Sequence, residues 1–159
     1  MRRSRAVAAV LAAGGLAVAG CSAPGPAEIT FYADGHTVRA APIGLCDLKT
    51  GKCTPNPSAA GTLKARAGKP VQISVPGELA KSLWKVTVQS VDGNGEPLPL
   101  KQDLITSQDR YAYTATPPTP DSRIVVVEVA QGAAFSATGN PDDVQTVTKA
   151  LWSLQVQPG

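Results

Sequence analysis

Apolar and polar residues alternate with a period of two along many short segments of this chain. Successive side chains of a strand point to opposite faces of a sheet, so this alternation predicts strands with one buried face. The alternating segments cover residues 28–33, 36–41, 62–67, 70–76, 84–89, 110–116, 123–130 and 151–157. The segment 123–130 is apolar almost throughout, which is expected of a central strand.

Turn-forming residues separate these segments. Asp34-Gly35 is a hairpin signal between the first two, and stretches rich in Gly and Pro divide the others. Many short strands at this spacing predict an all-β fold, either an antiparallel β-sandwich or a barrel. One short helical turn is expected near residues 141–146, where Asn140 and Pro141 have the form of a helix start. The β-branched residues from Val144 onward argue against a longer helix.

The aromatic residues narrow the choice of all-β fold. Trp84 lies on a strand in the middle of the chain, and Asp109, Tyr111 and Tyr113 follow. This arrangement resembles the immunoglobulin-like pattern, which has a tryptophan on a middle strand and a corner tyrosine farther on. We therefore predict a single immunoglobulin-like β-sandwich over residues 28–159, with Trp84 in the core between its sheets.

The first 20 residues have the organisation of a bacterial secretory signal, with a basic start, an apolar run and small residues at the end. The run is too short for a membrane-spanning helix, which needs roughly 20 apolar residues. VAGC, at 18–21, resembles the lipobox of bacterial lipoproteins. The resemblance implies a diacylglyceryl group on Cys21 and cleavage before it; the alternative is an ordinary signal with a chance cysteine. We expect a short lipidated tether at 21–27, and a protein held on the extracytoplasmic face of the cell membrane.

If Cys21 carries lipid, Cys46 and Cys53 remain as a pair on either side of the turn signal Thr50-Gly51. An exported chain meets an oxidising compartment, so we expect a structural disulfide, which stabilises a loop this short by about 2–2.5 kcal/mol. It is too local to be the inter-sheet bond of antibody domains. A redox or metal pair is the alternative, but redox pairs are usually C-x-x-C and metal sites need more ligands.

The formal net charge of +3 comes from the signal segment. Arg2, Arg3 and Arg5 are three of the 15 basic residues, so 15 − 3 leaves 12 basic residues against 12 acidic ones. A nucleic-acid-binding protein has a basic surplus, and the mature chain has none. We therefore expect no nucleic-acid partner.

Residue types that carry catalysis or bind metals are scarce. His36 is the single histidine, Met1 is the single methionine, and no nucleophile motif is present. Asp92, Asn94 and Glu96 echo a calcium-binding loop, but Pro97 stands where such a loop has glycine, so a hairpin tip explains them better. We expect no enzyme activity, no metal and no cofactor.

Several segments together resemble a family of actinobacterial lipoproteins of unknown function: ITFYADGHTVRAAPIGLC, GKPVQISVP, WKVTVQ, RYAYTATPP and LWSLQV. The resemblance covers nearly the whole mature chain. It supports the lipidation and the disulfide, and it implies no activity.

The leading functional hypothesis is a lipid-anchored binding module of the cell envelope, with a protein, wall or lipid ligand as its partner. The alternative is a carrier that holds a small hydrophobic ligand between the sheets, and an enzyme ranks third. The candidate partner-binding surface is the loop that the disulfide closes, with Asp47, Leu48, Lys49 and Lys52. A covalent closure lowers the entropic cost of presenting these side chains, although it could instead serve only to protect a sheet edge.

Overall fold

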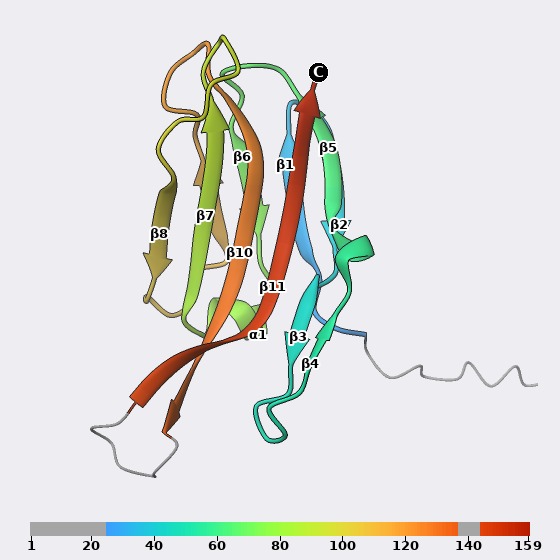
Figure 1. Ribbon diagram of the computed structural model, residues 1–159, viewed down its shortest axis with the longest axis vertical. Helices are drawn as coiled ribbons and strands as arrows, with labels where there is room; N and C mark the ends of the chain where they lie inside the picture. Colours follow the sequence, from blue (N-terminus) through green and yellow to red (C-terminus); the bar gives the residue numbers. More distant parts are fainter. Residues whose placement is uncertain (1–24, 137–143) are drawn as a thin grey trace, which may run out of the picture.

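Two β-sheets packed face to face form the structure, a computed structural model that describes residues 25–136 and 144–159 (Figure 1). Its strands are β1 (Ile29–Ala33), β2 (His36–Ala40), β3 (Gly44–Cys46), β4 (Cys53–Pro55), β5 (Gly61–Ala65), β6 (Val71–Ser74), β7 (Trp84–Val91), β8 (Lys101–Ile105), β9 (Ala112–Ala115), β10 (Arg123–Ser136) and β11 (Val144–Pro158). A 3-10 helix η1 (Pro57–Ala59) and a short α-helix α1 (Gly77–Ala80) complete the elements.

The strand order confirms the predicted antiparallel sandwich. One sheet has the order β2-β1-β6-β9, and the other has the order β4-β3-β11-β10-β7-β8, with β5 pairing in parallel with β11. The run β11-β10-β7-β8 facing β1-β6-β9 matches the G-F-C-C′ and A-B-E orders of immunoglobulin domains. All eight predicted strands are present, and β10 is central as expected, because β7 and β11 pair with its two sides.

Large apolar side chains fill the space between the sheets. Trp84 and Phe31 are 0% exposed and Trp152 is 1% exposed, which confirms Trp84 as a core residue. The two tryptophans differ in their hydrogen bonding. Nε1 of Trp152 donates to the Ala27 carbonyl at 3.0 Å, whereas Nε1 of Trp84 has no partner among the described residues.

The hairpin between β1 and β2 confirms the Asp-Gly signal. Asp34 and Gly35 have φ angles of 48° and 85°, the left-handed conformation that a two-residue hairpin requires. Nε and Nη2 of Arg66 donate to the Asp34 carboxylate at 2.7 and 2.6 Å, which ties the hairpin to the chain just after β5. These hydrogen bonds hold the pKa of Asp34 well below its usual value.

The predicted helical turn near 141–146 is wrong where the structure tests it. Residues 144–146 belong to β11, and Val144 pairs with Ser136 of β10; residues 141–143 lie outside the described part. Because Val144, Thr146 and Val147 are β-branched and a partner strand is at hand, the extended ladder is favoured over a helix. Within the described ranges, no helix is long and apolar enough to cross a bilayer.

The predicted tyrosine corner is also replaced by a different contact. Tyr113 lies on β9, an edge strand of the four-stranded sheet, and its hydroxyl donates to the Asp103 carboxylate on β8. The bond joins one edge of each sheet across the side of the sandwich. Burial, together with this bond, raises the pKa of Tyr113 to about 12, and the same bond lowers the pKa of Asp103.

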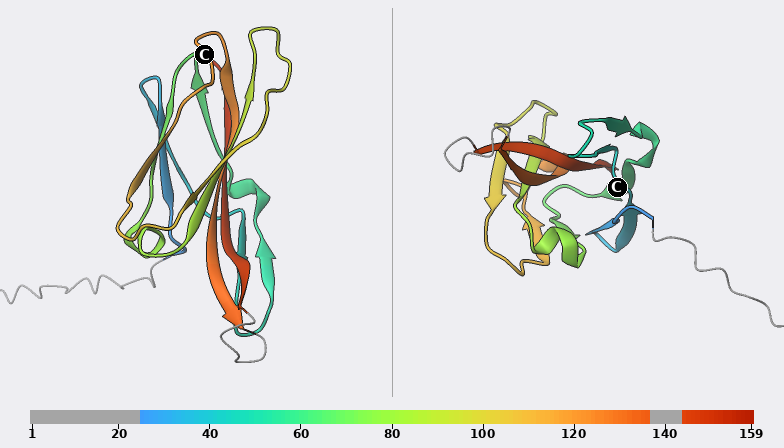
Figure 2. Two further views of the ribbon diagram at one scale, coloured as in Figure 1. Left: turned by 90° about the vertical axis from the view of Figure 1, so that its left-hand side faces the viewer. Right: turned by 90° about the horizontal axis from the view of Figure 1, so that it is seen from below.

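One end of the sandwich gathers the N-terminal segment, α1 and the β3–β4 hairpin, and we call it the tether end. Residues 25–27, Leu45 and Glu78 are among the residues that line a single hollow of about 470 Å³ there. The C-terminus lies at the opposite end (Figure 1). In the left view of Figure 2, the β3–β4 hairpin and the long β10–β11 hairpin project beyond the tether end. A lipid on Cys21, which lies outside the described residues, would attach the chain from this end.

Candidate functional site

The loop between β3 and β4 is closed at its base by the predicted disulfide. Cys46 and Cys53 are direct partners in the β3–β4 register, and their sulfur atoms are bonded to each other. Beyond them the chain closes once more, because Asp47 N–H donates to the Lys52 carbonyl at 2.8 Å. We call residues 47–52, closed in this way, the stapled loop.

The Asp47 side chain organises the interior of the stapled loop. Its carboxylate accepts hydrogen bonds from the backbone N–H groups of Lys49 at 2.8 Å and Thr50 at 3.4 Å. These bonds lower the pKa of Asp47. The carboxylate is therefore committed to the turn, which leaves the side chains of Leu48, Lys49 and Lys52 as the groups that the loop offers to a partner.

The three outward groups of the stapled loop are accessible. Leu48 is 36% exposed, Lys49 and Lys52 are also exposed, and neither lysine has an ion pair within 4.0 Å among the described residues. The loop borders a hollow of about 250 Å³ whose far side is formed by Val147 and Thr148 of β11. The structure thus brings the sequence-predicted loop residues together at the tether end.

A second candidate surface, which the sequence did not indicate, is the outer face of the seven-stranded sheet. We use this name for the side chains of β8, β7, β10 and β11 that point away from the four-stranded sheet. The register places them in rows across the strands, of which one is Leu104, Lys85, Ala130 and Leu151, and the next is Gln102, Thr87, Glu128 and Ser153.

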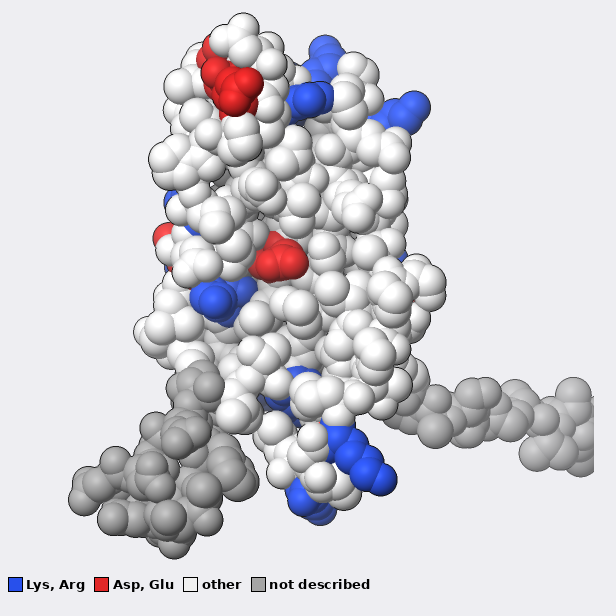
Figure 3. All heavy atoms as spheres, viewed as in Figure 1, with Lys and Arg blue, Asp and Glu red and all other residues white. Residues whose placement is uncertain are grey.

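The outer face is hollowed and carries few charged groups (Figure 3). A hollow of about 540 Å³ is lined by residues of all four strands, including Lys85 and Glu128. A neighbouring hollow of about 340 Å³ shares Lys85 and adds Leu104. Lys85 and Glu128 are half-buried, sit one row apart in the register, and have no ion pair within 4.0 Å among the described residues. Leu100 lines the first hollow and Leu104 lines the second, and each of these leucines is 61% exposed.

The sequence did not reveal this surface, because each of its segments, taken by itself, has an ordinary pattern. The alternation of β7 marks Lys85, Thr87 and Gln89 as its polar side, which is the ordinary pattern of a solvated face. Leu100 and Leu104 belong to a stretch in which no strand was predicted. Two leucines four residues apart beside a turn were the available signal, but only the pairing with β7 shows that they border a hollow.

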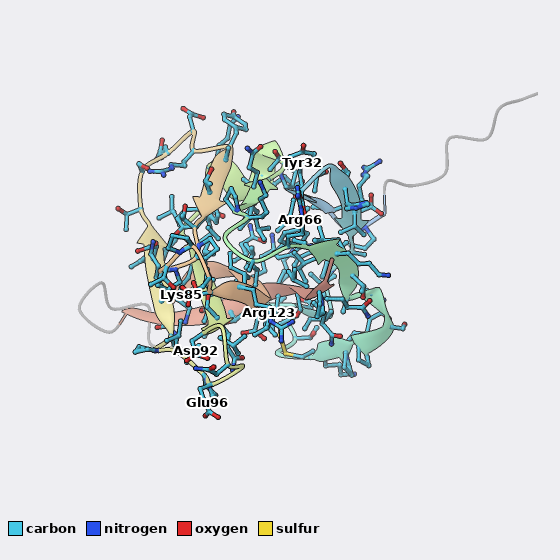
Figure 4. All side chains as sticks on the ribbon, turned by 90° about the horizontal axis from the view of Figure 1, so that it is seen from above. Tyr32, Arg66, Lys85, Asp92, Glu96 and Arg123 are labelled. Atoms are coloured by element: carbon cyan, nitrogen blue, oxygen red, sulfur yellow. A yellow bond between two sulfur atoms is a disulfide. The ribbon has the colours of Figure 1, made fainter. Side chains whose placement is uncertain are left out.

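The end opposite the tether holds a polar hollow of about 380 Å³ (Figure 4). Arg66, Asp92 and Arg123 line it. Arg66 is engaged by Asp34, as described above. The Asp92 carboxylate accepts hydrogen bonds from the N–H groups of Asn94 and Glu96, both at 2.9 Å, which confirms the predicted hairpin tip. Arg66 and Asp92 thus stabilise turns of this end, so the hollow is a weaker candidate than the outer face.

The described residues contain no group of three or more His, Cys, Asp or Glu side chains placed to hold a metal ion. The outer face carries Lys85 and Glu128, with the exposed side chains of Leu100 and Leu104 beside them. A few charged groups next to exposed apolar side chains are typical of a recognition surface.

Comparison with known proteins places the chain in a family. The family described as "Protein of unknown function (DUF2771)" matches residues 22–157, which include every described strand in whole or nearly so. No curated protein and no solved structure matches the chain. Because the match covers well over half of the sequence, the chain belongs to the DUF2771 family of proteins of unknown function.

Proposed function

We propose that this protein is a binding module, held by a lipid on Cys21 at the extracytoplasmic face of the cell membrane, that binds its partner on the outer face of the seven-stranded sheet. The observation that carries the proposal is the pair of neighbouring open hollows on that face, one lined by Leu100 and the other by Leu104, each leucine 61% exposed. Apolar side chains that gather around a hollow on a soluble domain mark interaction sites more often than they mark bare surface.

The free energy of binding favours a partner that covers Leu100 and Leu104. Burying the remaining exposed part of Leu100 and Leu104 contributes on the order of 1–2 kcal/mol each. Lys85 and Glu128 would gain from a partner that supplies charges complementary to them, because neither is paired in the described structure. Such contacts suit a polypeptide or a wall polymer better than a nucleic acid, since the mature chain has no basic surplus.

The packed core favours this module over a ligand carrier. A carrier needs space between its sheets, and here that space holds Trp84, Trp152 and Phe31, each at most 1% exposed. The hollows described above open on the surface instead. Recognition on an exposed sheet face therefore remains the function that the geometry supports best.

The anchor part of the proposal is supported by the sequence before the sandwich. A signal segment, a lipobox-like VAGC and a tether of residues 21–27 lead directly into β1. The match to the family covers the tether and the domain together, from residue 22 onward.

Site-specific photocrosslinking in growing cells tests the binding face. A photoreactive residue at Leu100 or Leu104 should give one discrete adduct. The matched control is Tyr32, an apolar side chain that is 43% exposed on the other sheet and should give none. Leu104→Asp should also remove the adduct formed from position 100.

Two results would decide against the outer face. Equal adducts from Tyr32 would show that the crosslinks report abundance rather than binding. Adducts from Lys49 in the stapled loop, with none from Leu100 or Leu104, would move the binding surface to the loop.

A further inference from the structure

The β3–β4 hairpin projects at the same end of the sandwich at which the N-terminal segment enters β1 (Figure 1). Gly44, at the start of β3, pairs with Leu151 of β11. The next residue of β11, Trp152, donates its indole N–H to the Ala27 carbonyl at 3.0 Å. The base of the hairpin is therefore level with Ala27, and its tip lies farther from the sandwich (Figure 1).

The reach of the hairpin matches the reach of the tether. Three extended steps from Gly44 to Asp47 span about 10 Å at about 3.3 Å per step, and the turn of the stapled loop lies beyond them. Six steps from Cys21 to Ala27 extend about 20 Å at most. A lipid on Cys21 would thus hold the bilayer surface at or near the depth that the stapled loop reaches, on the same side of the sandwich.

The chemistry of the loop tip suits that position. Leu48 is 36% exposed, and Lys49 and Lys52 of the same loop are exposed as well. The single acid of the loop, Asp47, is turned to backbone N–H groups within the loop. An apolar side chain accompanied by lysines is the arrangement that inserts at a membrane interface while its cations contact anionic headgroups.

We propose that the stapled loop rests on an anionic bilayer, with Leu48 among the headgroups and Lys49 and Lys52 against their phosphates. The proposal rests on the lipid anchor of the proposed function. The contact would orient the sandwich, with the tether end down and the outer face along its side, so that a partner could approach from beside the protein. The mature chain is neutral overall, so the attraction is local to the loop. The disulfide reduces the entropy that ordering the loop would cost.

Contact quenching on vesicles tests the orientation. The purified lipidated protein, processed to begin at Cys21, is reconstituted on phosphatidylcholine vesicles with or without phosphatidylglycerol, using lipids brominated near the headgroup. A Leu48→Trp variant reports contact, and Leu100→Trp is the matched control at an exposed leucine away from the tip. Trp84 and Trp152 give a constant background because they are at most 1% exposed.

The expected result is bromine quenching of the Leu48→Trp emission on anionic vesicles and none for Leu100→Trp. Replacing both lysines, by Lys49→Gln and Lys52→Gln, should lower the ratio of docked to free loop about 30-fold, because each lysine near an anionic surface contributes about fivefold. Quenching that is the same with and without phosphatidylglycerol would overturn the role of the lysines.

Sedimentation of the same samples separates the two proposals. Protein that sediments with the vesicles but shows no quenching at position 48 would overturn the loop contact and leave the lipid anchor intact. Protein that does not sediment would overturn the anchor, and the loop contact with it.

Discussion

The two core tryptophans offer a matched pair of substitutions, Trp84→Phe and Trp152→Phe. Both side chains are buried, at 0% and 1% exposure, and both changes remove the same atoms. The hydrogen bonding differs, since Nε1 of Trp152 donates to the Ala27 carbonyl and Nε1 of Trp84 has no partner among the described residues. The cavity and transfer terms are therefore similar in the two variants, and the difference between them isolates the indole N–H.

The expected difference follows from that N–H group. Removing a buried donor that has no partner recovers about 1–3 kcal/mol of desolvation in Trp84→Phe. Removing a satisfied donor loses about 0.5–1.5 kcal/mol in Trp152→Phe. The carbonyl of the half-buried Ala27 stays within reach of water, so it adds little. Trp152→Phe should be the more destabilising change by about 2–4 kcal/mol.

Equilibrium urea unfolding followed by far-ultraviolet circular dichroism measures both free energies of unfolding, because that signal comes mainly from the backbone and is present in both variants. The denaturant slopes of the two variants should agree, which would show that the same surface is exposed on unfolding. A Trp84→Phe variant destabilised as much as Trp152→Phe, or more, would refute the reasoning, because it would mean that the Trp84 N–H is satisfied in the folded protein.

Three further predictions concern single residues. Tyr113 should ionise near pH 12, above the ordinary pKa of 10.0. Because its pKa is raised in the folded state, the stability that Tyr113 contributes is complete below pH 10 and is lost as the pH rises toward 12. An ultraviolet titration in which Tyr113→Phe leaves the late transition unchanged would contradict this. Cys21→Ser should abolish acylation, so the protein should leave the detergent phase in a phase-partition assay, and acyl label retained on the variant would count against lipidation. Cys46 and Cys53 should appear as one linked peptide in non-reducing mass spectrometry, and reduction should lower stability by about 2–2.5 kcal/mol; two freely alkylated thiols in the exported protein would contradict the pairing.

Local features of the chain determined much of the fold. Period-two alternation located the eight strands that the sequence predicted, because the burial of alternate side chains is set within each segment. Asp34-Gly35 determined the β1–β2 turn, since few residue pairs adopt two successive positive φ angles without strain. Cys46 and Cys53 determined the stapled loop in the same way, because a short loop across a turn keeps the two thiols close in almost any fold.

Features that depend on strand pairing were decided only by the tertiary structure. Strands β3, β4 and β8 are short or carry exposed leucines, so they exist as strands because of their partners: β3 pairs with β11, β4 with β3, and β8 with β7. The contact between Tyr113 and Asp103 joins two sheet edges, and nothing in the local sequence brings those edges together.

The same distinction between local sequence and long-range pairing applies to the two candidate surfaces. The residues of the stapled loop are neighbours in sequence, so their grouping was predictable, but that they lie on the side from which the tether leaves was not. Lys85 and Glu128 are remote in sequence, and it is the β7–β10 register that puts them in one hollow. The composition determined that residues 21–159 carry 12 basic and 12 acidic side chains, whereas the topology determined that Lys49 and Lys52, which have no ion pair among the described residues, lie exposed at the tether end. The net charge is a sum over the whole chain, whereas the position of each charged side chain on the folded protein depends on long-range strand pairing.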